Sequence, residues 1–157
     1  MRTEPHSRWD RAGAPLRRGT LLGLCAVLLS LAGCSAPDDV LIDNARVRAL
    51  ITGQDKTVAY MDVQNRTDTI LTLTGASSEA VRTIEIHTTR MDDGVMRMRR
   101  LKTVDIPPGE TIRFEPGGRH LMLFGVKSLG EALPVRLEFA DGANREVVFS
   151  RIAVGGQ

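Results

Sequence analysis

The chain has 157 residues but only two cysteines, and both lie near its N-terminus. Cys25 and Cys34 are followed by a segment, residues 35–157, that contains no thiol. Such a segment can form no internal disulfide and offers no thiolate to a metal ion. This absence argues against a disulfide scaffold. It also argues against a blue-copper electron carrier, which needs a cysteine sulfur.

Histidine is almost as scarce, because only His87 and His120 follow residue 33. Neither belongs to a recognisable set of serine, histidine and acid. No second pair of carboxylates accompanies Glu85 or the neighbours Asp92 and Asp93. Nucleophilic and general acid–base catalysis need such arrangements. The sequence therefore predicts a protein that is not an enzyme.

The chain has no excess of basic charge once its N-terminal segment is set aside. Five of the 21 Lys and Arg residues and two of the 19 acidic residues lie within residues 1–33. The remainder holds 16 basic against 17 acidic side chains. This balance gives no reason to expect binding to nucleic acid.

Long hydrophobic runs are also missing. The longest, LLGLCAVLLSLAG at residues 21–33, is shorter than the roughly 20 residues that a membrane span needs. Arginines precede it, an order typical of a secretory signal peptide. The run closes in LAGC, Leu31 to Cys34, which resembles the bacterial lipobox, where the cysteine becomes the lipidated first residue. An ordinary signal peptide is the alternative.

These features predict three parts along the chain. Residues 1–33 would be a lipoprotein signal peptide, residues 34–39 a tether lipidated at Cys34, and residues 40–157 one folded domain. The protein would then lie in the cell envelope, in a periplasmic or other extracytoplasmic space, anchored to a membrane by lipid.

Helical periodicity is absent from residues 40–157. Short segments rich in Val, Ile and Thr alternate with turn residues such as DDG, PPGE and PGG. Many short strands at close spacing predict an all-β fold, an antiparallel sandwich or barrel. The expected strands are residues 41–50, 56–65, 68–77, 81–90, 95–104, 111–116, 120–127, 133–140 and 146–154.

What the domain does contain is a group of nitrogen and sulfur donors. Alternation in a strand places His120 and Met122 on one face, and Met96 with Met98 on one face of another strand. Thioether sulfur is soft and uncharged, so it binds Cu(I) well and hard cations poorly. Outside the cytoplasm thioethers resist oxidation better than thiols do. The composition therefore suits a Cu(I) site built from methionine and histidine.

The spacing of four of these residues carries a family resemblance. His87, Met98, His120 and Met122 follow the arrangement H-x10-M-x21-H-x-M. This arrangement resembles the signature of the PCuAC family of periplasmic copper chaperones. The segments IEIHTTRMDDGVMRMRRL and IPPGETIRFEPGGRHLMLFGVK are also similar to that family. One departure is Thr88, where some members carry a methionine.

The resemblance implies a cupredoxin-like antiparallel β-sandwich that binds Cu(I) through His87, Met98, His120 and Met122. It further implies delivery of copper to the CuA centre of cytochrome c oxidase, with oxidase subunit II or a thioredoxin-like copper chaperone as acceptor. Transfer would proceed by ligand exchange at a shallow, partly exposed site. A copper buffer for tolerance and a non-metal structural or assembly lipoprotein are the alternatives.

Other residues have two interpretations each. Met91, near the expected loop RMDDG, and Met96 are possible accessory ligands, although Met96 could simply pack and Met91 could simply be exposed. Met61 is expected in the core. The basic run from Arg97 to Lys102 is either a solvated strand face or a docking edge for an acidic partner.

Overall fold

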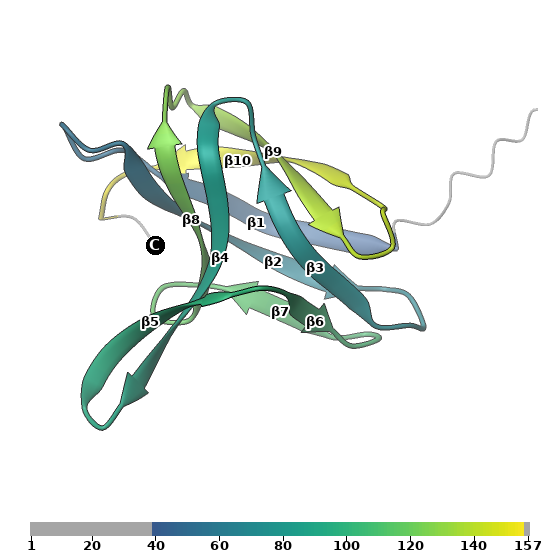
Figure 1. Ribbon diagram of the computed structural model, residues 1–157. Helices are drawn as coiled ribbons and strands as arrows, with labels where there is room; N and C mark the ends of the chain where they lie inside the picture. The colour runs from purple at the N-terminus through teal and green to yellow at the C-terminus, as the bar shows by residue number, and fades with distance from the viewer. Residues whose placement is uncertain (1–38, 156–157) are drawn as a thin grey trace, which may run out of the picture. The chain divides into compact units, whose positions relative to one another are not determined.

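The computed structural model describes residues 39–155, and within that range the chain forms ten strands (Figure 1). Nine were expected and lie close to their expected positions. The strands are β1 (Val40–Arg48), β2 (Lys56–Asn65), β3 (Leu71–Ser77), β4 (Val81–Asp92), β5 (Val95–Leu101), β6 (Val104–Ile106), β7 (Thr111–Phe114), β8 (Arg119–Val126), β9 (Ala132–Phe139) and β10 (Arg145–Ile152).

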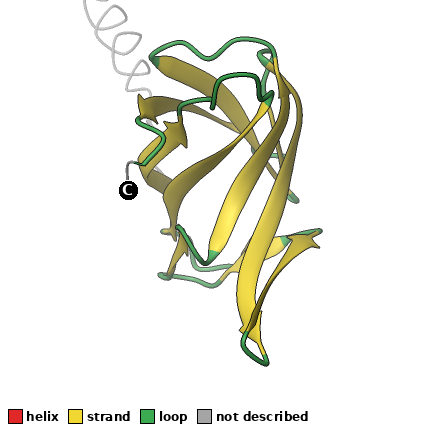
Figure 2. Cartoon of the chain, turned by 90° about the vertical axis from the view of Figure 1, so that its left-hand side faces the viewer, coloured by secondary structure: helices red, strands yellow, loops and turns green. Residues whose placement is uncertain are grey.

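The strands join into one sheet in the order β5-β4-β8-β7-β2-β1-β10-β9-β3-β6, with β8 also paired to β2. Most neighbours are antiparallel, as expected, while β1–β10 and β7–β8 are parallel contacts. The sheet curls so that β3 approaches β4, and the two halves face each other across a shared core (Figure 2). The all-β prediction is therefore confirmed.

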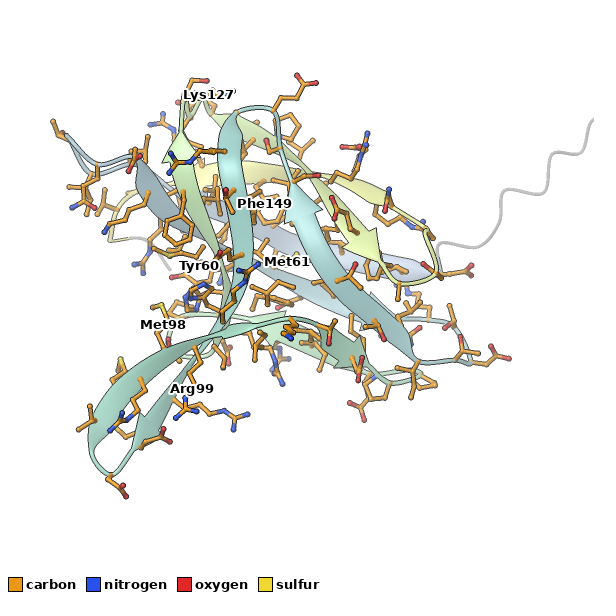
Figure 3. All side chains as sticks on the ribbon, in the orientation of Figure 1. Tyr60, Met61, Met98, Arg99, Lys127 and Phe149 are labelled. Atoms are coloured by element: carbon orange, nitrogen blue, oxygen red, sulfur yellow. The ribbon has the colours of Figure 1, made fainter. Side chains whose placement is uncertain are left out.

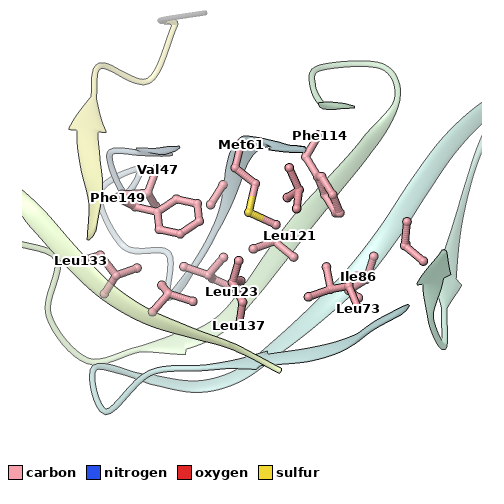
Figure 4. Packing of buried hydrophobic residues seen from close by; sticks show 14 of the residues in the cluster. Val47, Met61, Leu73, Ile86, Phe114, Leu121, Leu123, Leu133, Leu137 and Phe149 are labelled. Atoms are coloured by element: carbon pink, nitrogen blue, oxygen red, sulfur yellow. The ribbon is translucent and has the colours of Figure 1, made fainter. Parts of the chain in front are cut away.

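The core follows from strict alternation along the strands. In β9 the side chains of Leu133, Val135 and Leu137 are buried, while the residues between them are exposed. Leu121 and Leu123 of β8 point into the same core, which leaves His120 and Met122 for the opposite face. Figure 4 shows this packing, with the Met61 thioether in its middle. Met61 is thus a core residue, as expected.

The expected strand at residues 95–104 is wrong in one respect, because it divides into β5 and β6. β5 pairs with β4, whereas β6 pairs with β3 in the other half of the sheet. Val104 and Ile106 of β6 are buried, but nearly every side chain of β5 is exposed. The β4–β5 hairpin therefore projects from the body (Figure 2).

The expectations for the N-terminal segment lie outside the described residues. They comprise the signal peptide at residues 1–33, the lipidated Cys34 and the tether that starts there. Among residues 39–155, no helix is long and apolar enough to cross a membrane.

Candidate metal centre

Strands β4, β8 and β5 place all four expected ligands on one face of the sheet. His87 lies directly opposite His120 across the β4–β8 pair. Two residues further along β8, Met122 lies opposite Glu85. On the other side of β4, Met98 lies opposite Thr89, the next residue after His87 on that face. Residues directly opposite in a sheet share a face, so the four donors face the same way.

A two-residue turn sets the register that brings Met98 to this face. Asp93 and Gly94 both have positive φ, 50° and 77°, which is the geometry of a type I′ hairpin. The turn pairs Asp92 with Val95 and thereby fixes every later pair of the hairpin, including Thr89 with Met98. A slip of one residue would turn Met98 to the opposite face.

A second turn positions His120. Gly117 adopts a φ of 78°, as the two glycines before the strand suggested. The Gly118 carbonyl accepts a hydrogen bond from the Thr89 backbone N–H at 3.0 Å. It also accepts one from His120 Nδ1 at 3.2 Å. The start of β8 is therefore attached to β4 beside the site.

The His87 ring is oriented by a carboxylate. His87 Nε2 lies 2.9 Å from Glu85 Oε2. The other carboxylate oxygen, Glu85 Oε1, forms an ion pair with Arg100 Nη1 at 3.1 Å. An imidazole that donates Nε2–H to a carboxylate has its lone pair on Nδ1. His87 Nδ1 is buried and has no hydrogen-bond partner among the described residues.

His120 has the opposite tautomer, with its proton on Nδ1 and not on Nε2. Its Nδ1 donates to the Gly118 carbonyl, so the lone pair lies on Nε2, which is buried and lacks a partner in the described part of the chain. Burial lowers the pKa of His120 below its usual 6.5, the Gly118 hydrogen bond opposes this, and His87 adds to the lowering. The imidazole is thus kept neutral, the form that binds a metal.

The two rings and the two thioethers differ in exposure. The ring centroids are 6.0 Å apart, and only 14% of the His87 side chain and 4% of His120 are exposed. Met122 is half-buried, whereas Met98 is 53% exposed. The imidazoles therefore form the inner side of the site and Met98 its open side, which agrees with the expected shallow site.

The donor set fits a soft ion. Two imidazole nitrogens without a partner among the described residues lie on the same face as two thioethers, a combination that suits Cu(I). No group of three or more His, Cys, Asp or Glu residues that could hold a metal ion occurs within residues 39–155. A hard cation such as Mg²⁺ or Ca²⁺ would need such oxygen ligands.

Tyr60 lies on the same face of the sheet as the four proposed ligands. Val58 of β2 lies opposite Met122 of β8, and Tyr60, two residues further along β2, points to the same face as Val58. The guanidinium groups of Arg46 and Arg48 lie 5.7 and 5.6 Å from the centre of the Tyr60 ring. These arginines cover the ring, so Tyr60 is only 4% exposed. Figure 3 marks Tyr60 and Met98 near the base of the hairpin.

The supporting residues were not predicted. The i, i+2 spacing of Glu85 and His87 places both side chains on one face of a strand, and this was the available signal for their hydrogen bond. The role of the Gly118 carbonyl depends on the turn geometry, which carries no sequence signal beyond the two glycines. Tyr60 faces the site only because of how β2 pairs with β8.

The accessory candidates lie elsewhere on the hairpin. Met91 belongs to strand β4, not to a loop, and lies opposite Met96. Both are exposed, so packing does not account for Met96. In the basic run, Arg97 and Arg99 lie on the far face near Asp92, whereas Arg100 faces the site and pairs with Glu85.

A groove along β3 and β9 is remote from this chemistry. It has a volume of about 570 Å³. Ser77, Pro134 and Arg136 are among its lining residues, and no imidazole or thioether reaches it. The candidate metal centre therefore rests on the arrangement of the donors and not on this groove.

Known proteins resemble the chain in fold and in sequence. The copper-bound PCuAC domain from PmoF2 has a TM-score of 0.63 at 23% identity, with 73% of this chain and 93% of that domain covered. The solution structure of Cu(I)-DR1885 from Deinococcus radiodurans has a TM-score of 0.55 at 27% identity, with 76% of this chain and 82% of that chain covered. "Putative lipoprotein Lxx21020" of Leifsonia xyli subsp. xyli is 32% identical over 140 residues, with 79% of this chain and 83% of that protein covered.

A family model extends the match over the whole folded domain. Residues 40–150 match the family described as "Putative lipoprotein LpqE-like", which falls within the PCuAC group. These residues contain all ten strands except the last part of β10. The chain therefore belongs to the LpqE-like lipoprotein family, and its fold is the cupredoxin-like β-sandwich of PCuAC domains.

Proposed function

We propose that this protein is an extracytoplasmic copper chaperone that carries Cu(I) on His87, Met98, His120 and Met122. The observation that carries the proposal is the pair of buried imidazole nitrogens, His87 Nδ1 and His120 Nε2, which lack any partner among the described residues. Both lie on the face that also bears the two thioethers. The copper-bound state of the PmoF2 domain and the Cu(I) state of DR1885 support the choice of ion.

Copper is cargo in this proposal, so the site must release it as well as bind it. Thioethers are neutral and weakly hydrated, and they exchange without taking up or releasing a proton. Met98 is exposed and sits on a projecting hairpin, so an incoming ligand of an acceptor can replace it first. The imidazoles keep the ion while this exchange proceeds. No electron transfer is involved.

The chain's own residues prepare the site for this task. Glu85 fixes the His87 ring, and the Gly118 carbonyl fixes the His120 ring. Such outer contacts orient metal ligands before the metal arrives and raise their basicity. Burial of His120 keeps the ring neutral without any need to expel a proton near neutral pH.

The proposed setting is the cell envelope, with a lipid on Cys34 holding the domain at a membrane. The family description and the Leifsonia relative, both named as lipoproteins, support this setting. The proposed acceptor is the CuA centre of cytochrome c oxidase subunit II, or a thioredoxin-like copper chaperone that serves it. Buffering of surplus copper uses the same site, and only an acceptor assay distinguishes it from delivery.

An anaerobic Cu(I) titration tests the site. The chain from residue 35 onward competes with a chromophoric Cu(I) chelator, alongside the variants Met98→Leu and His120→Gln. We expect one tight equivalent, weakened by about tenfold or more in each variant, because a ligand should matter at least as much as its outer contacts. Met61→Leu removes a buried thioether that points into the core, away from the face that bears the four proposed ligands, and is the matched control.

The alternatives predict other results. A structural lipoprotein would bind Cu(I) weakly, and the variants would bind it as the parent does. An equal loss in the Met61→Leu control would show that the titration reports folding, not ligation.

A further inference from the structure

Three methionines lie on the surface of the β4–β5 hairpin instead of in the core. Met91 is 63% exposed, Met96 is 66% exposed and Met98 is 53% exposed. Methionine is an apolar side chain that usually fills gaps inside proteins, as Met61 does here. The three exposed thioethers fill no gap, so packing gives no reason for them.

The strand register arranges these side chains in a row. Met91 lies opposite Met96, the next pair on that face is Thr89 with Met98, and the pair after it contains His87. Successive pairs on one face are about 7 Å apart, since a strand rises about 3.4 Å per residue. Long, flexible thioether side chains can bridge that distance. The row therefore leads from near the tip of the hairpin to the imidazoles.

The opposite face of the hairpin has a different chemistry. It carries Arg90, Arg97 and Arg99, and Asp92 Oδ2 lies 3.5 Å from Arg99 and 3.9 Å from Arg97. Toward the tip of the hairpin, charged groups thus occupy one face and sulfur the other, while Arg100 lies on the sulfur face nearer the imidazoles.

We propose that Met91, Met96 and Met98 form an entry site that takes up Cu(I) and passes it to the four-ligand site, with Met98 shared by both. This inference rests on the proposed function. Three thioethers suit Cu(I), which accepts soft neutral donors in low coordination numbers. The entry site holds the ion more weakly than the inner site, because it lacks imidazole nitrogens.

The transfer is a sequence of ligand substitutions. The ion leaves Met91 and Met96 while Met98 keeps hold of it. His87 Nδ1 and His120 Nε2 then bind, and Met122 completes the set. The ion remains Cu(I) throughout, so no oxidant or reductant is consumed. No proton moves at sulfur, because a thioether carries none.

A loading experiment tests the entry site. Cu(I) is supplied anaerobically from a small-molecule chelator to the chain from residue 35 onward. The rate of Cu(I) loading is measured by stopped flow. In the double variant Met91→Leu/Met96→Leu we expect loading to slow severalfold. Leucine keeps the size and apolar character of methionine but removes the sulfur. An unchanged rate would overturn the proposal.

A second double variant, Met91→Gln/Met96→Gln, removes the apolar surface as well as the sulfur. We expect it to load as slowly as the leucine variant. If only the glutamine variant loads slowly, an apolar contact surface, not a sulfur site, explains the exposed methionines, and the entry site is rejected.

A direct measurement uses Ag(I), a redox-inert ion with similar preferences, and methionine methyl resonances. In a His120→Gln chain, whose inner site is damaged, the Met91 and Met96 methyl signals should still shift on addition of Ag(I). Absence of these shifts would also reject the entry site. The proposed function fails separately, since its failure would appear as loss of the tight equivalent in the parent equilibrium titration.

Discussion

At the scale of single residues, Glu85 is the most informative side chain outside the four proposed ligands. Replacement by alanine frees the His87 ring to rotate and leaves Arg100 without its carboxylate. We expect Cu(I) affinity to fall by about 10- to 100-fold, the usual effect of losing an outer contact of a metal ligand. The competition titration measures it.

Glu79→Ala is the matched control for that change, because Glu79 is an exposed acid outside the metal face. Glu85→Gln should restore part of the affinity, since the amide oxygen can still accept from the ring. An affinity that survives the loss of Glu85 would show that packing alone orients His87.

His120 makes the stability of the copper-free protein depend on pH. In the unfolded chain this imidazole binds a proton near pH 6.5, whereas burial lowers its pKa in the folded chain. The unfolded state therefore binds more protons below pH 6.5. The contribution of neutral His120 to the free energy of unfolding is fully present above pH 6.5. It is lost as the pH falls toward the lower pKa of His120 in the folded chain.

Urea unfolding of the copper-free chain at a series of pH values checks this expectation. The free energy of unfolding should fall more steeply below pH 6.5 in the parent than in His120→Gln, which lacks the ring. Parallel curves for the two proteins would contradict it. Comparing the two chains cancels the contribution of the acidic residues that they share.

Much of the candidate site at this scale was predictable. Alternation alone placed His120 with Met122 and Met96 with Met98, and the strands have these faces. The combination of four ligands came from the family resemblance, not from alternation, and it stays a prediction. The hydrogen bonds of Glu85 and Gly118 were beyond reach, because they depend on side-chain rotamers and on one turn.

At the scale of elements, the β4–β5 hairpin depends on its turn. Gly94 has a φ of 77°, and a Cβ there would meet no neighbouring atom. The cost of Gly94→Ala is therefore backbone strain alone. We expect a loss of about 1 kcal/mol in local hairpin stability, seen as faster amide exchange along β5.

The substitution Gly130→Ala provides the comparison. Gly130 has no such positive φ, and its added Cβ would meet only ordinary contacts. Exchange along β5 should be unchanged in this variant. Equal exchange in both variants would show that the turn does not hold the hairpin.

The division of residues 95–104 into β5 and β6 was not predictable from local pattern. Asn65 shows why, because its side chain is fully buried and donates to the carbonyl of Ile106 at 2.8 Å and of Thr69 at 2.7 Å. These bonds attach β6 and the turn after β2 to each other. A hydrogen bond between residues 41 positions apart cannot be predicted from the pattern of ten neighbouring residues.

At the scale of the whole molecule, the all-β class and nine of the ten strands followed from short alternating segments and turn residues. The parallel pairing of β1 with β10, which joins the two halves of the sheet, did not. Such pairing depends on which distant strands fit together around the core. Only the assembled fold brings β2 against β8 and places Tyr60 on the face that bears His120.

The position of Tyr60 gives the domain a built-in optical reporter. The chain has one tryptophan and one tyrosine, and Trp9 lies in the segment expected to be removed. The processed protein would then emit ultraviolet fluorescence from Tyr60 alone, a ring that lies under two guanidinium groups on the face that bears the imidazoles. An ion that binds the imidazoles should alter this emission. Metal arrival at the site can therefore be followed without a dye, and Tyr60→Phe provides the dark reference.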